Sequence, residues 1–269
     1  MANKKKLEEQ RLMIENLKRK RRNIFYTAIA IIVAIVVIVG VLVGSGVLQS
    51  GSSNDPTSVT SGTWTKVSSS DIGQGGVNIY FLSWQGCPIG ASDSFAIYHY
   101  FHTNFPSLSN STMIKAEHFS DPSESPSDIP GLLFHNFTAT SSGITYSFHV
   151  VYVYGETLPP DGPTSVNAGI STLKAVSGFP SAVINMFIKM ETSVTTVGLG
   201  NQAIASYAGH LTSSLIVTGP KASYYFEGEM YNPSDISGVS PSTILSSISS
   251  YSYILTASSN IQTTVSTVL

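Results

Sequence analysis

The sequence has little charge, one cysteine and almost no arginine. Only 11% of its 269 residues are charged, and beyond residue 22 it has five lysines, no arginine and thirteen acidic residues. Because phosphate binding needs clustered Lys and Arg, we expect no nucleic acid partner. One cysteine permits no internal disulfide, and no His, Cys and acidic residues stand at a spacing typical of metal sites. We therefore expect no metal and no cofactor.

The basic residues are concentrated at the start of the chain. Residues 1–22 carry nine Lys and Arg against three Glu, and residues 24–48 then run without a charge. At ~1.5 Å per residue such a helix exceeds the ~30 Å hydrocarbon layer. We predict a basic cytoplasmic segment at 1–22, a transmembrane helix at 23–48 that lies in the lipid bilayer of the plasma membrane, and an extracytoplasmic domain beyond it. A cleaved signal peptide is the alternative, but its apolar core is only ~7–15 residues long.

The remainder divides into a tether and a folded region. Residues 49–70 are rich in Ser, Thr and Gly and predict a linker, with the folded domain at 71–269. Apolar patterns predict a strand at 77–82, an aromatic helix face from Ala91 to Phe105 and a strand at 145–154. A hairpin at 215–218 and 223–229 and a terminal helix from Ser242 follow. Residues 180–190 fit either a helix or a strand.

The turn between the first strand and helix holds Cys87, flanked by Gly86, Pro88 and Gly90. A thiol at a helix N-terminus meets unpaired backbone N–H groups and the positive end of the helix dipole. Both favour an anion, which would lower the pKa of Cys87 and make the sulfur a candidate redox nucleophile. Because free cysteine is usually buried, we favour Cys87 as a small apolar residue at the strand–helix junction, with a monothiol redox site and an intermolecular disulfide as the alternatives.

The segment Ser83 to Phe101, SWQGCPIGASDSFAIYHYF, resembles the archaeal membrane-anchored thioredoxin-like proteins of the domain of unknown function 929 family (DUF929). The segment Tyr225 to Gly238 and the basic start with a single anchor support the resemblance. It implies a thioredoxin-like α/β domain, with a central mixed sheet flanked by helices, and a C-terminal helical extension. The family name assigns no activity.

Two features of a working thioredoxin are missing. A dithiol oxidoreductase needs a second cysteine to resolve the mixed disulfide, and Gly90 stands where the resemblance places it. The resemblance also implies a cis-proline before the late strand. If that strand is 215–218, no proline precedes it; if it is 182–188, Pro180 fits, but the later hairpin does not. We prefer 215–218, which makes the redox site degenerate.

Three functions therefore remain open. The domain could bind another envelope protein or a peptide without catalysis, through a face centred on Trp84, Gly86 and Pro88. It could instead be a monothiol thiol-disulfide oxidoreductase that uses Cys87. A third reading is a structural surface glycoprotein, since Asn110 and Asn136 begin N-x-Ser/Thr acceptor sequons. The exposure of Cys87 separates the first two functions from the third: a buried thiol rules out exchange chemistry, whereas an exposed thiol beside an aromatic groove is compatible with both binding and catalysis.

Overall fold

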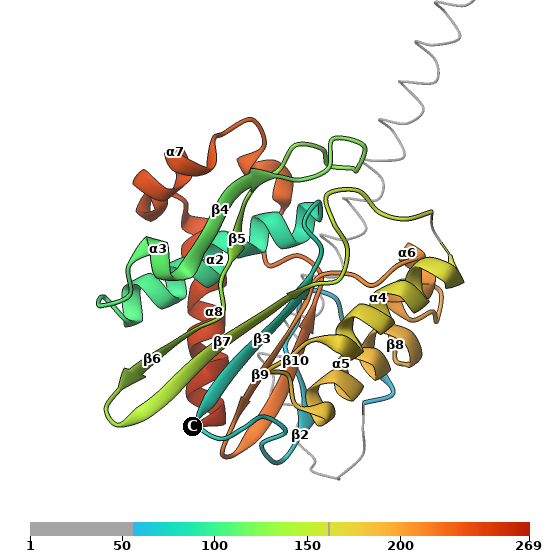
Figure 1. The fold of residues 1–269 in the computed structure, drawn as a ribbon, viewed down its shortest axis with the longest axis horizontal. Coiled ribbons are helices and arrows are strands. Elements are labelled where there is room, and N and C mark those ends of the chain that lie inside the picture. Colours follow the sequence, from blue (N-terminus) through green and yellow to red (C-terminus); the bar gives the residue numbers. More distant parts are fainter. Residues whose placement is uncertain (1–55, 161) are drawn as a thin grey trace, which may run out of the picture. The chain divides into compact units, whose positions relative to one another are not determined.

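A six-stranded mixed sheet with the strand order β2-β10-β9-β3-β7-β6 lies at the centre of the domain (Figure 1). The structure is a computed structural model, and it describes residues 56–160 and 162–269. The strands, in this order, are β2 (Thr65–Ser68), β10 (Ala222–Glu227), β9 (Ser214–Gly219), β3 (Val77–Ser83), β7 (Ile144–Tyr152) and β6 (Phe137–Ser141). The fold is a mixed α/β arrangement with a mixed central sheet and flanking helices, as the sequence predicts at this level.

The central strand β3 is buried along its whole length. It pairs in parallel with β7 and antiparallel with β9, so both of its edges are hydrogen-bonded. Helices cover both faces of the sheet (Figure 1). A strand covered on both faces needs a continuous apolar run instead of an alternating one, and VNIYFLS supplies it. The predicted strand at 77–82 is confirmed.

One face of the sheet is covered by α2 (Pro88–Asn104) and α8 (Ser252–Val268). Outside α2 lies a two-stranded sheet of β4 (Ile114–Phe119) and β5 (Pro130–Phe134), with the short helices α3 (Asn110–Met113) and α7 (Pro241–Ser246) nearby. Because α2 contacts both α8 and β5, it is buried nearly all round, and the expected single aromatic face is only part of its packed surface.

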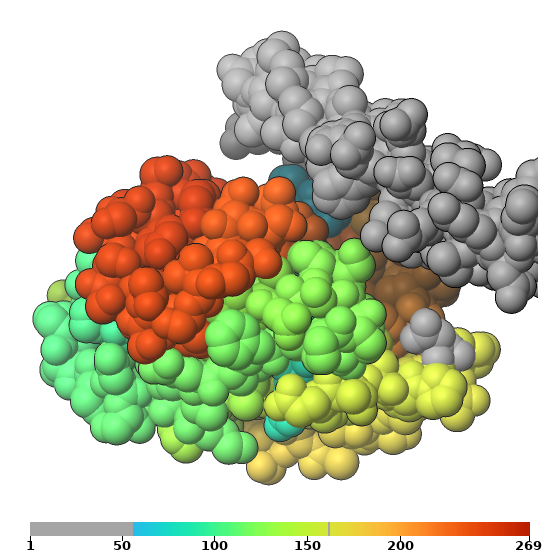
Figure 2. Space-filling model, turned by 90° about the horizontal axis from the view of Figure 1, so that it is seen from above, coloured from blue at the N-terminus to red at the C-terminus, as the bar shows by residue number. Residues whose placement is uncertain are grey.

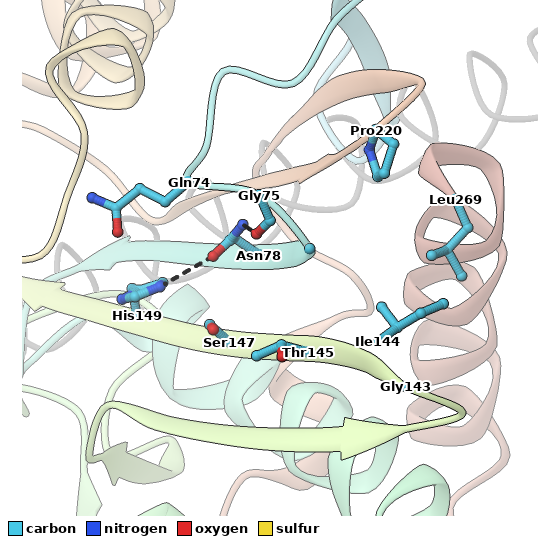
Figure 3. A pocket seen from close by; sticks show the side chains of 11 residues that line it. Gln74, Gly75, Asn78, Gly143, Ile144, Thr145, Ser147, His149, Pro220 and Leu269 are labelled. Atoms are coloured by element: carbon cyan, nitrogen blue, oxygen red, sulfur yellow. Dashed lines mark hydrogen bonds between the residues drawn. The ribbon is translucent and has the colours of Figure 1, made fainter.

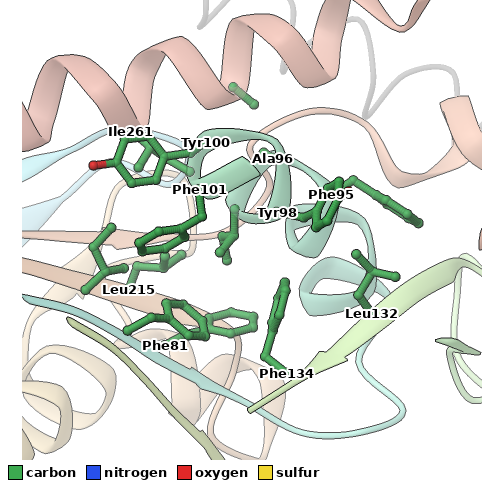
Figure 4. Packing of buried hydrophobic residues seen from close by; sticks show 14 of the residues in the cluster. Phe81, Phe95, Ala96, Tyr98, Tyr100, Phe101, Leu132, Phe134, Leu215 and Ile261 are labelled. Carbon is green, nitrogen blue, oxygen red and sulfur yellow. The ribbon is translucent and has the colours of Figure 1, made fainter. Parts of the chain in front are cut away.

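Phenylalanine rings fill the space between α2 and the sheet (Figure 4). Phe101 of α2 lies edge-on to Phe148 of β7 at 5.6 Å and to Phe137 of β6 at 4.8 Å between ring centres. Phe134 of β5 contacts Phe148 at 5.2 Å. Edge-to-face geometry stabilises such pairs beyond their buried area, so these rings join α2 to three strands.

The opposite face of the sheet carries α4 (Pro163–Ala175) and α5 (Ser181–Ser193). The helix α6 (Ile204–Ala208) packs against α5. Of the two readings left open for 180–190, the helix is correct, with Pro180 as its N-cap. The strand reading of 182–188 is therefore wrong, and β9 is the late strand that pairs with β3.

Two strands fall inside the predicted linker. Residues 58–59 form β1, which pairs in parallel with β8 (Thr195–Thr196), and β2 pairs with β10. The folded region thus begins before residue 71, because polar Ser and Thr residues join the sheet edge through backbone hydrogen bonds that composition does not reveal. Residues 49–55 of the predicted linker, the basic segment 1–22 and the predicted transmembrane helix at 23–48 lie outside the described residues.

The C-terminal helix is part of the core. Ile254, Ile261 and Val265 of α8 are buried against α2 and the sheet. Figure 2 shows the C-terminal segments in orange and red beside the β4–β5 region in green. Within residues 56–160 and 162–269, no helix combines the length and the apolar character that crossing a bilayer requires.

Candidate functional site

The turn that follows β3 places Cys87 at the N-cap of α2. The backbone N–H of Cys87 donates to the carbonyl of Trp84 at 3.1 Å, which closes the turn. Cys87 itself is extended, and its Sγ accepts from the backbone N–H of Gly90 at 3.3 Å. Pro88 takes the first helical position, where a missing N–H is tolerated. The predicted placement of the thiol at the helix start is therefore confirmed.

The thiol is buried, and the helix start does not lower its pKa. Cys87 is only 4% exposed, and burial raises its pKa to about 12, outweighing the backbone N–H groups of Gly90 and Ile89, which act in the opposite direction. Desolvation disfavours the thiolate more than the helix start stabilises it. The nearby carboxyl of Asp93 also raises the pKa of the thiol. In this state Cys87 is a neutral, covered thiol.

The position of the missing second cysteine has no room for a side chain. A Cβ added to Gly90 would lie 2.1 Å from Ser83 Oγ and 3.1 Å from Ser213 Oγ. Ser83 ends β3 and Ser213 directly precedes β9, and both are about 1% exposed. Hydroxyls from two strands therefore fill the space that a second thiol would need.

The Cys87 turn is covered by two loops. The N–H groups of Gln85 and Gly86 each donate at 3.3 Å to the carbonyls of Tyr154 and Gly155, which follow β7. A Cβ added to Gly86 would lie 1.9 Å from the carbonyl oxygen of Glu156. From the other side, the backbone N–H of Asp121 donates to the Gly86 carbonyl at 2.9 Å.

As a result, the residues predicted to form a binding face are all covered. Trp84, Gly86 and Pro88 are buried, whereas Gly155 and Glu156 of the covering loop are exposed. A partner that approaches this end of the sheet would first meet the covering loop.

Two buried polar atoms beside the turn have no hydrogen bond. They are the indole Nε1 of Trp84 and the hydroxyl of Ser213. The Trp84 ring meets His210 edge-on at 5.9 Å. Buried polar groups usually find a partner, so unbonded ones next to a cysteine mark this end of the sheet as a candidate site.

No cis-proline precedes β9. Among residues 56–160 and 162–269, the cis peptide bond is Ser125–Pro126, in the loop between β4 and β5. The bond before Pro180 is therefore trans, and Ser213 occupies the place directly before the late strand. Both departures from a working thioredoxin remain in the folded chain.

Both sequon asparagines are exposed. Asn110 begins α3, and its Oδ1 accepts from the hydroxyl of Tyr98 at 2.9 Å. Asn136 lies between β5 and β6, and its Oδ1 accepts from the N–H of Val150 at 2.8 Å. Both bonds use the amide oxygen and leave the amide nitrogen, to which a glycan is attached, outside these contacts.

Acidic side chains are buried in the domain, and sequence patterns did not identify Glu191 and Glu227 among them. Glu191, Glu227 and Asp93 are each at most 1% exposed. Burial raises the pKa of Glu191 to about 7, raises the pKa of Glu227, and raises the pKa of Asp93 well above its ordinary value. The only sequence signal is their place in apolar surroundings, as in NMFIKME and YYFEGE.

A separate pocket of about 680 Å³ opens at the other end of β3 and β7 (Figure 3). There Asn78 donates to the carbonyl of Gly75 at 2.9 Å and lies 3.4 Å from Nε2 of His149. His149 stacks on Tyr80 at 4.8 Å. The amide of Asn78 thus holds the glycine turn before β3. Elsewhere, His99 is bonded to Ser258 of α8, and no cluster of three metal-binding side chains occurs among the described residues.

A family model described as Domain of unknown function (DUF929) matches residues 63–267. Neither a curated protein nor a solved structure matches the chain.

Proposed function

The chain belongs to the family described as Domain of unknown function (DUF929), and from the geometry of its own residues we propose that it is a non-catalytic thioredoxin-like binding module. In this proposal a membrane anchor at residues 24–48 displays the domain outside the cell. The degenerate redox end of the sheet, around Trp84, Gly86 and Pro88, binds another envelope protein or a peptide.

The strand topology supports the thioredoxin-like assignment. Four strands in the order β7-β3-β9-β10 have β3 parallel to β7 and antiparallel to β9, with β10 antiparallel to β9. The helix α2 connects to the Cys87 turn, α4 and α5 precede β9 on the opposite face, and α8 follows the hairpin. The resemblance implies a central mixed sheet flanked by helices, with a helix after the late hairpin, and this arrangement supports the proposal.

The observation that carries the non-catalytic part is the filled space at Gly90. Dithiol exchange needs a second thiol that attacks the mixed disulfide of the first. Ser83 and Ser213 leave no volume for it, and Cys87 is covered and neutral. Binding needs neither thiol, and the unbonded Trp84 Nε1 and Ser213 Oγ are polar groups that a bound backbone could satisfy once the covering loop moves.

Site-specific photo-crosslinking in the full chain tests this function. A photoreactive residue replaces Gln85 or Glu156 at the covered end, or Thr140 on β6 as an exposed control. We expect defined crosslinked products from the first two positions and none from Thr140. Equal products at all three positions would contradict a dedicated binding end.

The same experiment distinguishes the monothiol alternative. Each crosslinking variant is repeated with Cys87→Ser. Non-covalent binding predicts unchanged products, because serine preserves the size of the buried side chain. A monothiol oxidoreductase would instead be supported by two results: the parent forms a reductant-sensitive adduct, and Cys87→Ser loses both this adduct and the crosslinked products.

Anchoring and glycosylation are tested separately. Protease added to intact cells should digest the domain if it lies outside the membrane, and full protection would contradict that orientation. Asn110→Gln and Asn136→Gln should each remove one glycan mass from the purified chain, because both side chains are exposed. An unchanged mass in both variants would exclude N-glycosylation.

A further inference from the structure

Two carboxyl groups face one another in the interior, outside the Cys87 site. Glu191 lies near the end of α5 and Glu227 ends β10, and their exposed fractions are 0% and 1%. The hydroxyl of Tyr225 lies between them, 2.9 Å from Glu227 Oε2 and 3.4 Å from Glu191 Oε1. The three side chains form one buried cluster, named here the Glu191–Tyr225–Glu227 cluster.

The hydrogen-bond partners of the two carboxyls are all neutral among the described residues. Glu191 accepts from the N–H of Thr212 at 3.0 Å and from the hydroxyl of Ser214 at 2.7 Å. Glu227 accepts from the hydroxyl of Thr196 at 2.6 Å. These donors satisfy oxygen atoms, but they do not neutralise two negative charges.

None of the described hydrogen bonds joins either carboxyl of the cluster to a cationic side chain. Tyr154, two residues after β7, is close enough for Glu191 to help raise its pKa, and His210 packs edge-on to the Tyr154 ring at 6.3 Å. Lys189 lies two residues before Glu191 on α5, a spacing that places the side chains on different sides of a helix.

The proton count favours a neutral Glu191. Tyr225 has one hydroxyl proton and can donate to only one carboxyl at a time, and Glu227 is the nearer acceptor. A protonated Glu191 can donate to the Tyr225 oxygen and complete a chain from Glu191 through Tyr225 to Glu227. The pKa of Glu191 is raised to about 7, mainly by burial and also by the charge of Glu227, while the hydrogen bonds from Thr212 and Ser214 act in the opposite direction. Ionisation therefore breaks this chain and leaves two buried charges.

The cluster binds Thr212 and Ser214 before and at the start of β9, and Thr196 of the β1–β8 pair. Glu191 binds the residues 212 and 214 on either side of Ser213, the residue that packs beside Gly90. Glu227 binds Thr196 of β8, a two-residue strand whose partner β1 is equally short. Residues 211–213 form no strand, and the β1–β8 pair has two residues in each strand. Segments with few backbone hydrogen bonds open locally before the large sheet does.

We infer that the Glu191–Tyr225–Glu227 cluster is an acid-set latch. When Glu191 is protonated, the cluster holds residues 212–214 and the β1–β8 pair in their closed positions. Ionisation of Glu191 opens both segments and weakens the packing of Ser213 beside Gly90 in the Cys87 turn. Water can then reach the carboxylates, which relieves the cost of burying unpaired charge. The inference holds whether or not a partner binds at the turn.

Hydrogen exchange of the full chain, followed by mass spectrometry and corrected for intrinsic rates, tests the latch. An ordinary pKa of 4.5 in the open state and about 7 in the closed state predict roughly fiftyfold loss of protection between about pH 5 and about pH 7.5. At about pH 7.5 the peptides that cover 57–62, 194–197 and 211–215 should be clearly less protected than the peptides of β3, which exchange only through global unfolding.

Matched variants assign the effect to the cluster. Glu191→Gln and Glu227→Gln keep the side-chain shape without the charge, so we expect the pH dependence of these peptides to be largely lost. Glu117→Gln, at an exposed position of β4, should behave as the parent. The same pH dependence in Glu191→Gln as in the parent overturns the latch. If these peptides stay as well protected as β3 in the parent at about pH 7.5, the latch is also overturned, even if neither variant folds.

Discussion

We predict that Cys87 is almost inert toward alkylation in the folded chain. Burial raises the pKa of its thiol from 9.0 to about 12. Since only the thiolate reacts, the reactive fraction near neutral pH falls by about a thousandfold relative to an unperturbed thiol. The covering contacts of Gly86 with the loops at Glu156 and Asp121 slow access further, because they must open first.

The assay measures the rate of iodoacetamide incorporation by mass spectrometry as a function of pH. The full chain is compared with a free cysteine peptide, with the same chain in guanidinium, and with Cys87→Ser as the blank. We expect a native rate about a thousandfold below that of the peptide and a normal rate after unfolding. A rate that levels off below about pH 8, or that lies within about tenfold of the peptide, would refute the assignment of a covered neutral thiol.

Three further predictions concern stability. The free energy of unfolding should fall by about 3 kcal/mol as the pH rises from 4.5 to about 7, because the raised pKa of Glu191 stabilises the fold below 4.5 and that stability is lost as Glu191 ionises. Denaturation at both pH values should show a smaller loss in Glu191→Gln. An equal loss in the variant and the parent would contradict the pKa shift. Gly90→Ala should lower the free energy of unfolding by about 1–3 kcal/mol, because the added Cβ meets Ser83 Oγ at 2.1 Å. The double variant with Ser83→Ala should lose less than the sum of the two single losses. Strict additivity in urea denaturation would contradict that contact. Phe101→Ala should lower the free energy of unfolding by about 3–5 kcal/mol, because the ring is fully buried. Phe119→Ala, at a side chain that is 45% exposed, should change the thermal unfolding temperature little. Similar shifts for the two variants would contradict the packing described.

Local patterns predicted much of the fold. The strand at 77–82, the Cys87 helix start and the hairpin of β9 and β10 were visible because apolar spacing and Gly or Pro breaks act over a few residues. Short polar strands such as β1 and β2 were missed, since their pairing depends on distant partners. The helix α4 was missed as well, because it begins at the last proline of the sequence PPDGP, whose composition is typical of a turn.

The sequence by itself determined that one thiol stands at a helix N-terminus and that Gly90 replaces a second. Only the tertiary structure decided what that thiol is like. Loops from residues 121 and 154–156 cover it, and the desolvation they cause outweighs the helix N-terminus. In the same way, Glu191 and Glu227 are ordinary acids in the sequence, and they become a coupled pair because α5 and β10, 36 residues apart at these positions, bring them to one buried tyrosine.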